Sequence, residues 1–155
     1  MQLYIFGYGS LMNLKSRKKT LPGNRAVLPT QLSGFQRKIN ALVDGYLFLN
    51  IVPAKGNVEG VLIPVTLAEL EVFKTREPGY ERVDVTEKIK AGVKGKVYAF
   101  IAPDVEYPEK KIPRSYLLTC TRGMDEVTRN RWFQETLINN PIEEDVEKPV
   151  YEFNA

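Results

Sequence analysis

Apolar residues along the 155-residue chain recur at alternate positions or in short runs, a pattern typical of β-strands. Glycine and proline interrupt these runs and indicate turns between them. The pattern predicts strands over Leu3–Tyr8, Ala26–Leu32, Phe35–Leu42, Tyr46–Ile51, Val58–Val65, Tyr80–Lys88, Val93–Ala102 and Ser115–Thr121.

Three segments favour helices instead. Leu11 to Lys19 is consistent with a short helix, and Thr66-Leu67-Ala68-Glu69 has the pattern of a capping box that begins a helix running to about Arg76. Asp125 is a suitable N-cap for the last predicted helix. That helix would carry Val127, Trp132, Phe133, Leu137 and Ile138.

Many strands with few helices in a chain of this length predict an α+β fold. We expect a single domain over residues 1–155, built on a small mixed closed β-barrel with a few short flanking helices, because closure removes exposed strand edges. Periodicity alone does not separate a barrel from a sandwich. The acidic stretch from Asn139 to Glu147 is expected to be loosely attached.

The absence of histidine narrows the possible chemistry most, since it removes histidine-based triads and the usual zinc sites. Acid–base catalysis would fall to Asp, Glu, Lys, Tyr or Cys. The single cysteine, Cys120, excludes an internal disulfide and fits a reducing compartment such as the cytoplasm. Cys120 is expected to be a small buried residue.

Charge and hydropathy suggest neither a nucleic-acid nor a membrane partner. The net charge is only +3, and its densest basic run, Arg17-Lys18-Lys19, is typical of a solvated helix face. No apolar stretch is long enough to span a bilayer, and the N-terminal residues lack the pattern of a signal peptide. The sequence does not indicate an oligomeric state.

The first candidate site is Gly7-Tyr8-Gly9-Ser10-Leu11, between the first strand and the first predicted helix. Its glycines allow a tight turn and a close approach to a ligand, and backbone N–H groups there would suit a carboxylate or an oxyanion. Ser10 adds a hydroxyl. A plain strand-to-helix turn would show the same residues.

The second candidate site is Arg76-Glu77-Pro78-Gly79-Tyr80. Because the residue before a proline disfavours the α region, Glu77 should directly follow the helix. The helix dipole and any burial would both raise the pKa of the Glu77 carboxyl, which would make it a useful proton shuttle near neutral pH. An exposed glutamate at a helix end fits the same pattern.

Other side chains are more readily explained by structure. Arg82 and Asp84 would form a surface pair if Val83 and Val85 face the core. Trp132 and Phe133 are more typical of core residues than of a binding site.

The two candidate sites together resemble the γ-glutamylcyclotransferase-like (AIG2-like) family. Tyr4 to Leu11 is similar to the N-terminal signature of that family, and Leu70 to Val85 is similar to a later segment with Glu77, Tyr80 and Arg82 in register. Further similarities are Val58-Glu59-Gly60-Val61-Leu62, Ser115-Tyr116 and Gly123.

The resemblance implies an amide-cleaving acyltransferase that acts by a lyase-like cyclisation, without cofactor or metal. Its substrate would be a γ-glutamyl amide of an amino acid, an amine or an acylated small molecule. The substrate's α-amine would attack the side-chain carbonyl and release 5-oxoproline. Glu77 would be the general acid/base, and the substrate-binding residues would be Tyr8, Gly9, Ser10, Leu11 and Tyr80. The alternative is a non-catalytic barrel that binds a glutamate-like carboxylate.

Overall fold

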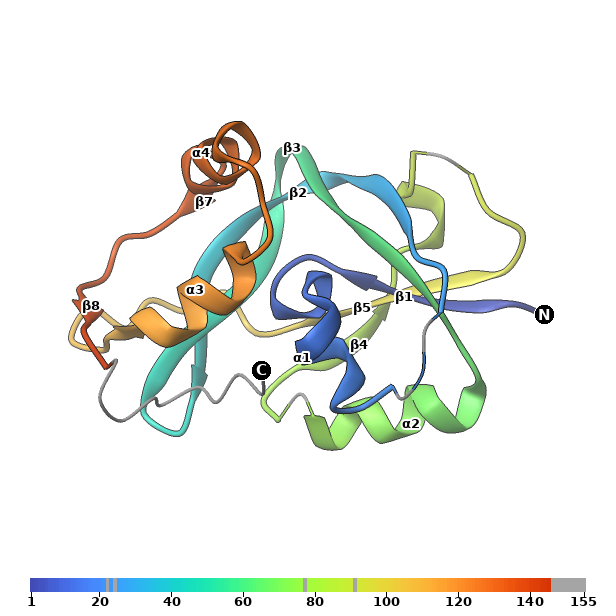
Figure 1. Cartoon of the computed structure of the whole chain (residues 1–155), viewed down its shortest axis with the longest axis horizontal. Helices are drawn as coiled ribbons and strands as arrows, with labels where there is room; N and C mark the ends of the chain where they lie inside the picture. Colours follow the sequence, from blue (N-terminus) through green and yellow to red (C-terminus); the bar gives the residue numbers. More distant parts are fainter. Residues whose placement is uncertain (22, 24, 77, 91, 146–155) are drawn as a thin grey trace.

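The computed structural model describes residues 1–21, 23, 25–76, 78–90 and 92–145, with the side chain of residue 76 excepted. Figure 1 shows the elements in chain order. They are β1 (Leu3–Gly7), η1 (Ser10–Met12), α1 (Leu14–Lys18), β2 (Leu28–Val43), β3 (Tyr46–Val65), α2 (Leu67–Arg76), β4 (Glu81–Asp84), η2 (Thr86–Lys88), β5 (Lys96–Ile101), β6 (Ile112–Pro113), α3 (Arg114–Thr121), α4 (Glu126–Gln134), β7 (Thr136–Leu137) and β8 (Ile142–Glu143).

The main sheet has six strands in the order β4-β5-β1-β3-β2-β7, and β6 and β8 form a small second sheet. The mixed α+β class is confirmed, because β1 runs parallel to β5 and antiparallel to β3. The closed barrel is wrong: within the described ranges β4 and β7 are the two edges and do not pair with each other. Both edge strands are short, and β4 is exposed and rich in charge, so the edges are protected without closure.

A long bent hairpin of β2 and β3 replaces the four strands expected between residues 26 and 65. The pairing shifts register between Ser33 and Phe35, where Gly34 adopts a positive φ of 82°. Such a bulge bends a strand without ending it. This is why each of the two long strands was predicted as two separate strands. The turn uses Asp44 and Gly45, both with positive φ, as a two-residue hairpin turn requires.

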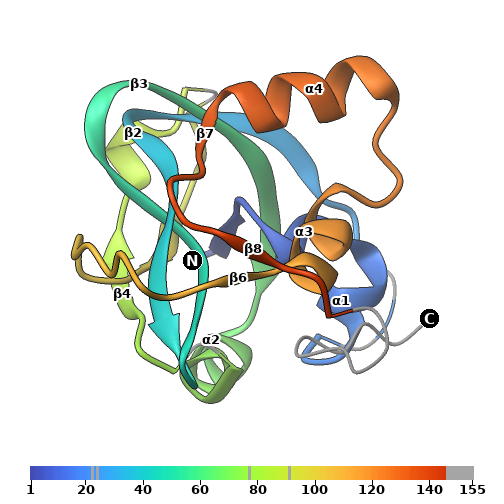
Figure 2. The same ribbon diagram turned by 90° about the vertical axis from the view of Figure 1, so that its left-hand side faces the viewer.

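Two hydrophobic clusters lie on opposite faces of the sheet. One includes Leu70 and Phe73 of α2 packed with Ile5 and Phe100, and the other includes Trp132 of α4. In the second cluster the side chains of α3 and α4 pack with Phe6, Leu49 and Leu62, among others. Figure 2 shows α3 and α4 on the side of the sheet away from α2. This layering, with helices on both faces, buries the sheet.

The predicted strand at Ser115–Thr121 is wrong, because these residues lie in helix α3. Tyr116, Leu117, Cys120 and Thr121 are buried while Leu118 is half exposed, which is a helical and not an alternating pattern. Asp145 stabilises the first turn of α3, where it accepts hydrogen bonds from the Ser115 N–H (2.8 Å) and hydroxyl (2.5 Å).

The acidic C-terminal stretch is therefore not loosely attached over its described part, residues 139–145. Ile142 and Glu143 pair with β6 in parallel, and Asp145 is buried against α3. Asn140 donates hydrogen bonds to the Tyr107 and Lys110 carbonyls. Glu147 lies outside the described residues.

Helices α2 and α4 begin at the predicted caps, and α4 ends earlier than expected. Thr66 and Glu69 exchange the two hydrogen bonds of a capping box, and Asp125 accepts from the Thr128 N–H at 2.7 Å. Helix α4 ends at Gln134, so Leu137 belongs to β7 and Ile138 lies beyond the helix. No helix in the described ranges is long and apolar enough to cross a membrane.

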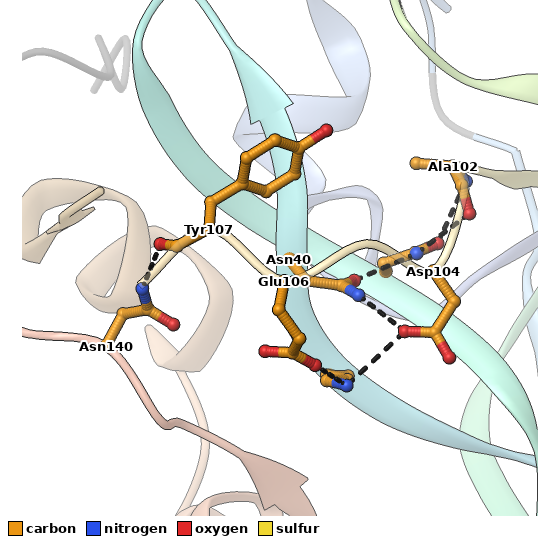
Figure 3. A network of polar contacts seen from close by, with 8 residues as sticks. Asn40, Ala102, Asp104, Glu106, Tyr107 and Asn140 are labelled. Carbon is orange, nitrogen blue, oxygen red and sulfur yellow. Dashed lines mark hydrogen bonds and ion pairs between the residues drawn. The ribbon is translucent and has the colours of Figure 1, made fainter. Parts of the chain in front are cut away.

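A polar network, buried at Asn40 and Asn50 and exposed at Asp104 and Glu106, joins the segment after β5 to the β2–β3 hairpin (Figure 3). The side chain of Asn50 on β3 exchanges two 2.9 Å hydrogen bonds with the Ala102 backbone and donates a third to Asn40 at 3.0 Å. Asn40 donates to Asp104 at 2.8 Å, and Lys38 forms ion pairs with Asp104 and Glu106. The network holds the segment after β5 against β3 without a backbone ladder.

Candidate functional site

A pocket opens where strand β1 ends. β1 pairs with β3 up to Val61 and with β5 up to Tyr98, and after Gly7 the chain leaves the sheet. The pocket has a cavity volume of about 40 Å³. Its described lining residues are Phe6, Tyr8, Gly9, Ser10, Leu11, Leu49, Tyr80, Phe100 and Tyr116.

The five predicted substrate-binding residues are thus brought together. Tyr8, Gly9, Ser10 and Leu11 form one wall, and Tyr80 reaches the pocket from the segment after α2. Glu77 lies outside the described residues. Helix α2 ends at Arg76, as the sequence predicted, and Tyr80 lies only three positions after Glu77.

Two glycines allow the loop to lie close to β3. A Cβ atom on Gly60 would overlap the Gly7 carbonyl oxygen and the Phe6 ring. A Cβ on Gly9 would lie 2.9 Å from Leu49 Cδ2 and 3.2 Å from Tyr116 Oη. Contacts this short require a neighbour to move, so both positions favour glycine.

Four hydrogen bonds hold the loop, two of them between residues far apart in the chain. The Tyr8 hydroxyl donates to the Phe100 carbonyl at 2.5 Å, and the Asn13 amide donates to the Thr119 carbonyl of α3 at 3.0 Å. Arg17 Nη1 donates to the Leu11 carbonyl at 2.8 Å and to that of Met12 at 3.3 Å. The loop is therefore fixed to β5, α3 and α1 at once.

Arg17 corrects a prediction, since it is not part of a solvated helix face. Only 6% of Arg17 is exposed, while Lys18 and Lys19 are exposed as expected. Burial lowers the pKa of its guanidinium. Its hydrogen bonds reach six and five residues back to the carbonyls of Leu11 and Met12, and the basic run itself gives no signal of them.

Two tyrosine hydroxyls cover the open edge of β3 at Leu49. Tyr80 donates to the Leu49 carbonyl at 2.5 Å, and the Leu49 N–H donates to the Tyr116 hydroxyl at 3.2 Å. Both backbone groups of Leu49 are thus satisfied by side chains that line the pocket.

These contacts decide which groups can donate to a ligand. The Tyr8 and Tyr80 hydroxyls donate to the backbone carbonyls of Phe100 and Leu49. Among the described residues, the Ser10 hydroxyl and the N–H groups of Gly9, Ser10 and Leu11 have no hydrogen-bond partner. The loop therefore has donors available for an anion.

The pocket contains no charged side chain among its described lining residues. Its walls are aromatic or aliphatic apart from Ser10 and the hydroxyl oxygens. The described ranges also hold no cluster of three Cys, Asp or Glu residues suited to a metal ion.

The other candidates lie elsewhere. Arg82 and Asp84 are at the surface but do not form a pair with each other, since Arg82 bonds Glu71 at 2.9 Å and Asp84 pairs with Lys96 at 3.4 Å. Val85 is buried, but Val83 is 36% exposed.

The remaining apolar candidates are mostly in the core. Cys120 is buried as predicted, and burial raises the pKa of its thiol to about 12. Trp132 is buried as expected, whereas Phe133 is partly exposed.

Tyr116 and Leu49 line the pocket but were not among the predicted site residues. Ser115-Tyr116 resembled the family, but the prediction of a strand there gave the wrong direction for the Tyr116 side chain. Leu49 has no distinguishing side chain, and only the end of β1 makes its backbone part of the site.

The γ-glutamyl cyclotransferase, AIG2-like family matches residues 5–118. The chain belongs to this family. The match includes every predicted site residue, from Tyr8 to Tyr80, and ends within α3. No curated protein matches the chain.

Solved structures share this fold. YkqA from Bacillus subtilis superimposes with a TM-score of 0.68 at 18% identity over 88% of this chain, which spans 56% of the length of YkqA. A structure named gamma-glutamyl cyclotransferase matches with a TM-score of 0.68 at 15% identity over 95% of this chain and 96% of its own. A protein from Arabidopsis thaliana is 30% identical, with a TM-score of 0.55 over 69% of this chain and 72% of its own.

Proposed function

We propose that this protein is a γ-glutamyl cyclotransferase. It cleaves a γ-glutamyl amide of an amino acid, an amine or an acylated small molecule by attack of the substrate's α-amine on the side-chain carbonyl. The products are 5-oxoproline and a free amine. The observation that carries the proposal is the pocket, in which the Tyr8–Leu11 loop and Tyr80 meet in a chain that belongs to this family.

The substrate would bind with its α-carbon between the loop and the two tyrosines. The N–H groups of Gly9, Ser10 and Leu11 would hold the α-carboxylate, because they are donors without a partner in the described ranges. The hydroxyl oxygens of Tyr8 and Tyr80 would accept from the α-ammonium. Fixing the α-carbon orients the amine, and a pocket that also folds the side chain back would bring the carbonyl carbon beside it.

Glu77 would move the proton. The α-amine attacks in its neutral form, after one ammonium proton has passed to solvent. As its nitrogen bonds to the side-chain carbonyl carbon, the Glu77 carboxylate takes a second proton from that nitrogen, which gives a tetrahedral oxyanion. When the oxyanion collapses, the bond to the leaving nitrogen breaks and the Glu77 carboxyl gives its proton to that nitrogen. An apolar pocket favours this role, since it raises the pKa of a carboxyl group.

The test is a panel of γ-glutamyl amino acids and amines, with 5-oxoproline measured by mass spectrometry. Wild-type protein is expected to release 5-oxoproline from at least one member. Glu77→Gln should lower turnover by about 10²- to 10⁴-fold, the usual contribution of a general acid/base. Glu81→Gln, at an exposed position of β4, is the matched control and should keep full activity.

Two results would contradict the proposal. Equal turnover by wild type and Glu77→Gln would show that Glu77 is not the general acid/base. If glutamine binds in calorimetry but no substrate yields 5-oxoproline, the protein is not an enzyme of this kind. It is then a non-catalytic protein that binds a glutamate-like carboxylate.

A further inference from the structure

Arg17 is a buried cation directly behind the candidate site. It lies in the last turn of α1, is 6% exposed, and points its Nη1 at the carbonyls of Leu11 and Met12. Among the described residues it has no acidic partner, and its remaining N–H groups have no hydrogen bond. Burying most of a guanidinium without a carboxylate partner costs free energy.

The hydrogen bonds from Arg17 complete a consistent orientation of the loop. The Gly9 and Ser10 carbonyls accept from the N–H groups of Met12 and Asn13 at 2.9 and 3.0 Å, and the next two carbonyls accept from Arg17. All four carbonyls from Gly9 to Met12 are thus occupied within the protein. The N–H groups of Gly9, Ser10 and Leu11 stay without a partner in the described ranges, and these three residues line the pocket.

We propose that Arg17 is a positioning residue that makes this loop selective for a carboxylate. It holds the loop carbonyls away from the ligand, and its buried positive charge stabilises a negative charge on the other side of the loop. This inference rests on the proposed function, and it names the substrate's α-carboxylate as the group that Arg17 recognises through the loop. Arg17 itself does not touch the substrate.

The effect of Arg17 on recognition of the α-carboxylate can be measured with two substrates that differ only in this group. One is γ-glutamyl p-nitroanilide, and the other is 4-aminobutyryl p-nitroanilide, which lacks the α-carboxylate and cyclises to 2-pyrrolidinone. The ratio of their kcat/KM values within one preparation does not depend on how much protein is folded. A variant that is merely less stable therefore leaves the ratio unchanged.

Arg17→Met should lower kcat/KM for the γ-glutamyl substrate by about 10- to 100-fold, in the range of a lost charge-assisted interaction, and that for the 4-aminobutyryl substrate by much less. Arg17→Lys keeps the charge and should restore most of the ratio. Lys18→Met, on the exposed neighbouring position, is the matched control and should keep the wild-type ratio. If wild type does not turn over the 4-aminobutyryl substrate, its inhibition constant gives the same comparison.

An equal loss on both substrates in Arg17→Met would overturn the inference and leave Arg17 a structural residue. The failure of the proposed function would look different, because wild type would then release no 5-oxoproline at all. In that case calorimetry with glutamine and 4-aminobutyramide decides the question. Wild type should bind glutamine more tightly, and Arg17→Met should lose this preference; equal preference in both proteins would refute the role of Arg17.

Discussion

Leu49 and Asn50 are neighbours on β3 and face two regions that use polar groups in opposite ways. Asn50 belongs to the network of Figure 3, where its oxygen and both N–H groups are hydrogen-bonded. Leu49 faces the pocket, where the Ser10 hydroxyl and the Gly9–Leu11 N–H groups have no partner in the described part of the chain.

The difference separates a region that stabilises the fold from one that is prepared for a ligand. A buried network with every group satisfied rigidifies the structure, whereas an unsatisfied donor beside a pocket costs stability until a ligand supplies the acceptor. We therefore expect substitutions on the Asn50 side to change stability and those on the Leu49 side to change activity.

The largest effect is expected for Asn50→Ala, which leaves the Ala102 N–H and carbonyl and the Asn40 side chain without their partner. The free energy of unfolding should fall by about 3 kcal/mol, since each buried unsatisfied group costs on the order of 1–3 kcal/mol. Chemical denaturation measures this loss. Activity per folded molecule should stay within about twofold of wild type. A large loss of activity would show that the network and the pocket do not act separately.

The next largest effect is expected for Gly9→Ala, where the new Cβ would meet Leu49 Cδ2 and Tyr116 Oη. A displaced loop should lower kcat/KM by about 100-fold, the cost typical of a misplacement near 1 Å. Gly56→Ala is the matched control, because its Cβ would lie 3.7 Å from the nearest atom. Similar kinetics for the two variants would show that the loop position does not matter.

Tyr80→Phe should have a moderate effect. It removes the 2.5 Å hydrogen bond to the Leu49 carbonyl and an acceptor for the substrate's ammonium group, while the ring stays in the wall. We expect about a tenfold rise in KM, consistent with one lost hydrogen bond to a charged group. Tyr98→Phe, a tyrosine on β5 outside the pocket lining, is the control. An unchanged KM would show that the Tyr80 hydroxyl does not contribute to substrate binding.

The smallest effect concerns Glu69, which is remote from the pocket lining. Hydrogen bonds from Arg25 lower the pKa of its carboxyl to about 2. Because the pKa is depressed on folding, this contribution is fully present above about pH 4.5 and is lost as the pH falls toward 2. The pair is partly exposed, so about 1 kcal/mol is expected.

Denaturation of wild type and Glu69→Gln from pH 2 to 7 measures this contribution. The two curves should converge at low pH, and wild type should be more stable at neutral pH. A constant difference across the range would show that the carboxylate charge plays no part.

Local signals made part of the fold predictable. β1 and the starts of α2 and α4 depend on short apolar runs and on caps within three or four residues, and these predictions are confirmed. The strand predicted at Ser115–Thr121 is wrong because its helix depends on Asp145, thirty residues along the chain. Closure of the sheet likewise depends on strand pairing that alternation along one strand does not specify.

The same limit applies to the candidate site. The loop from Tyr8 to Leu11 and Tyr80 were predictable because their residues carry a motif, and the pocket brings them together. Tyr116 was missed because its contact with Leu49 joins distant parts of the chain. Arg17 was missed because the basic run around it is typical of a solvated helix face, although its partner Leu11 is close in sequence. The predicted role of Glu77 stays a prediction.

The hydrogen bonds between Asp145 and Ser115 have a consequence for where the chain can be cut. The family match ends at residue 118, before Asp145, so a shortened chain based on sequence similarity would contain every proposed site residue. It would lack the carboxylate that stabilises the start of α3, which carries Tyr116 into the pocket wall. The smallest fragment that resembles the family is therefore shorter than the smallest fragment that can build its pocket.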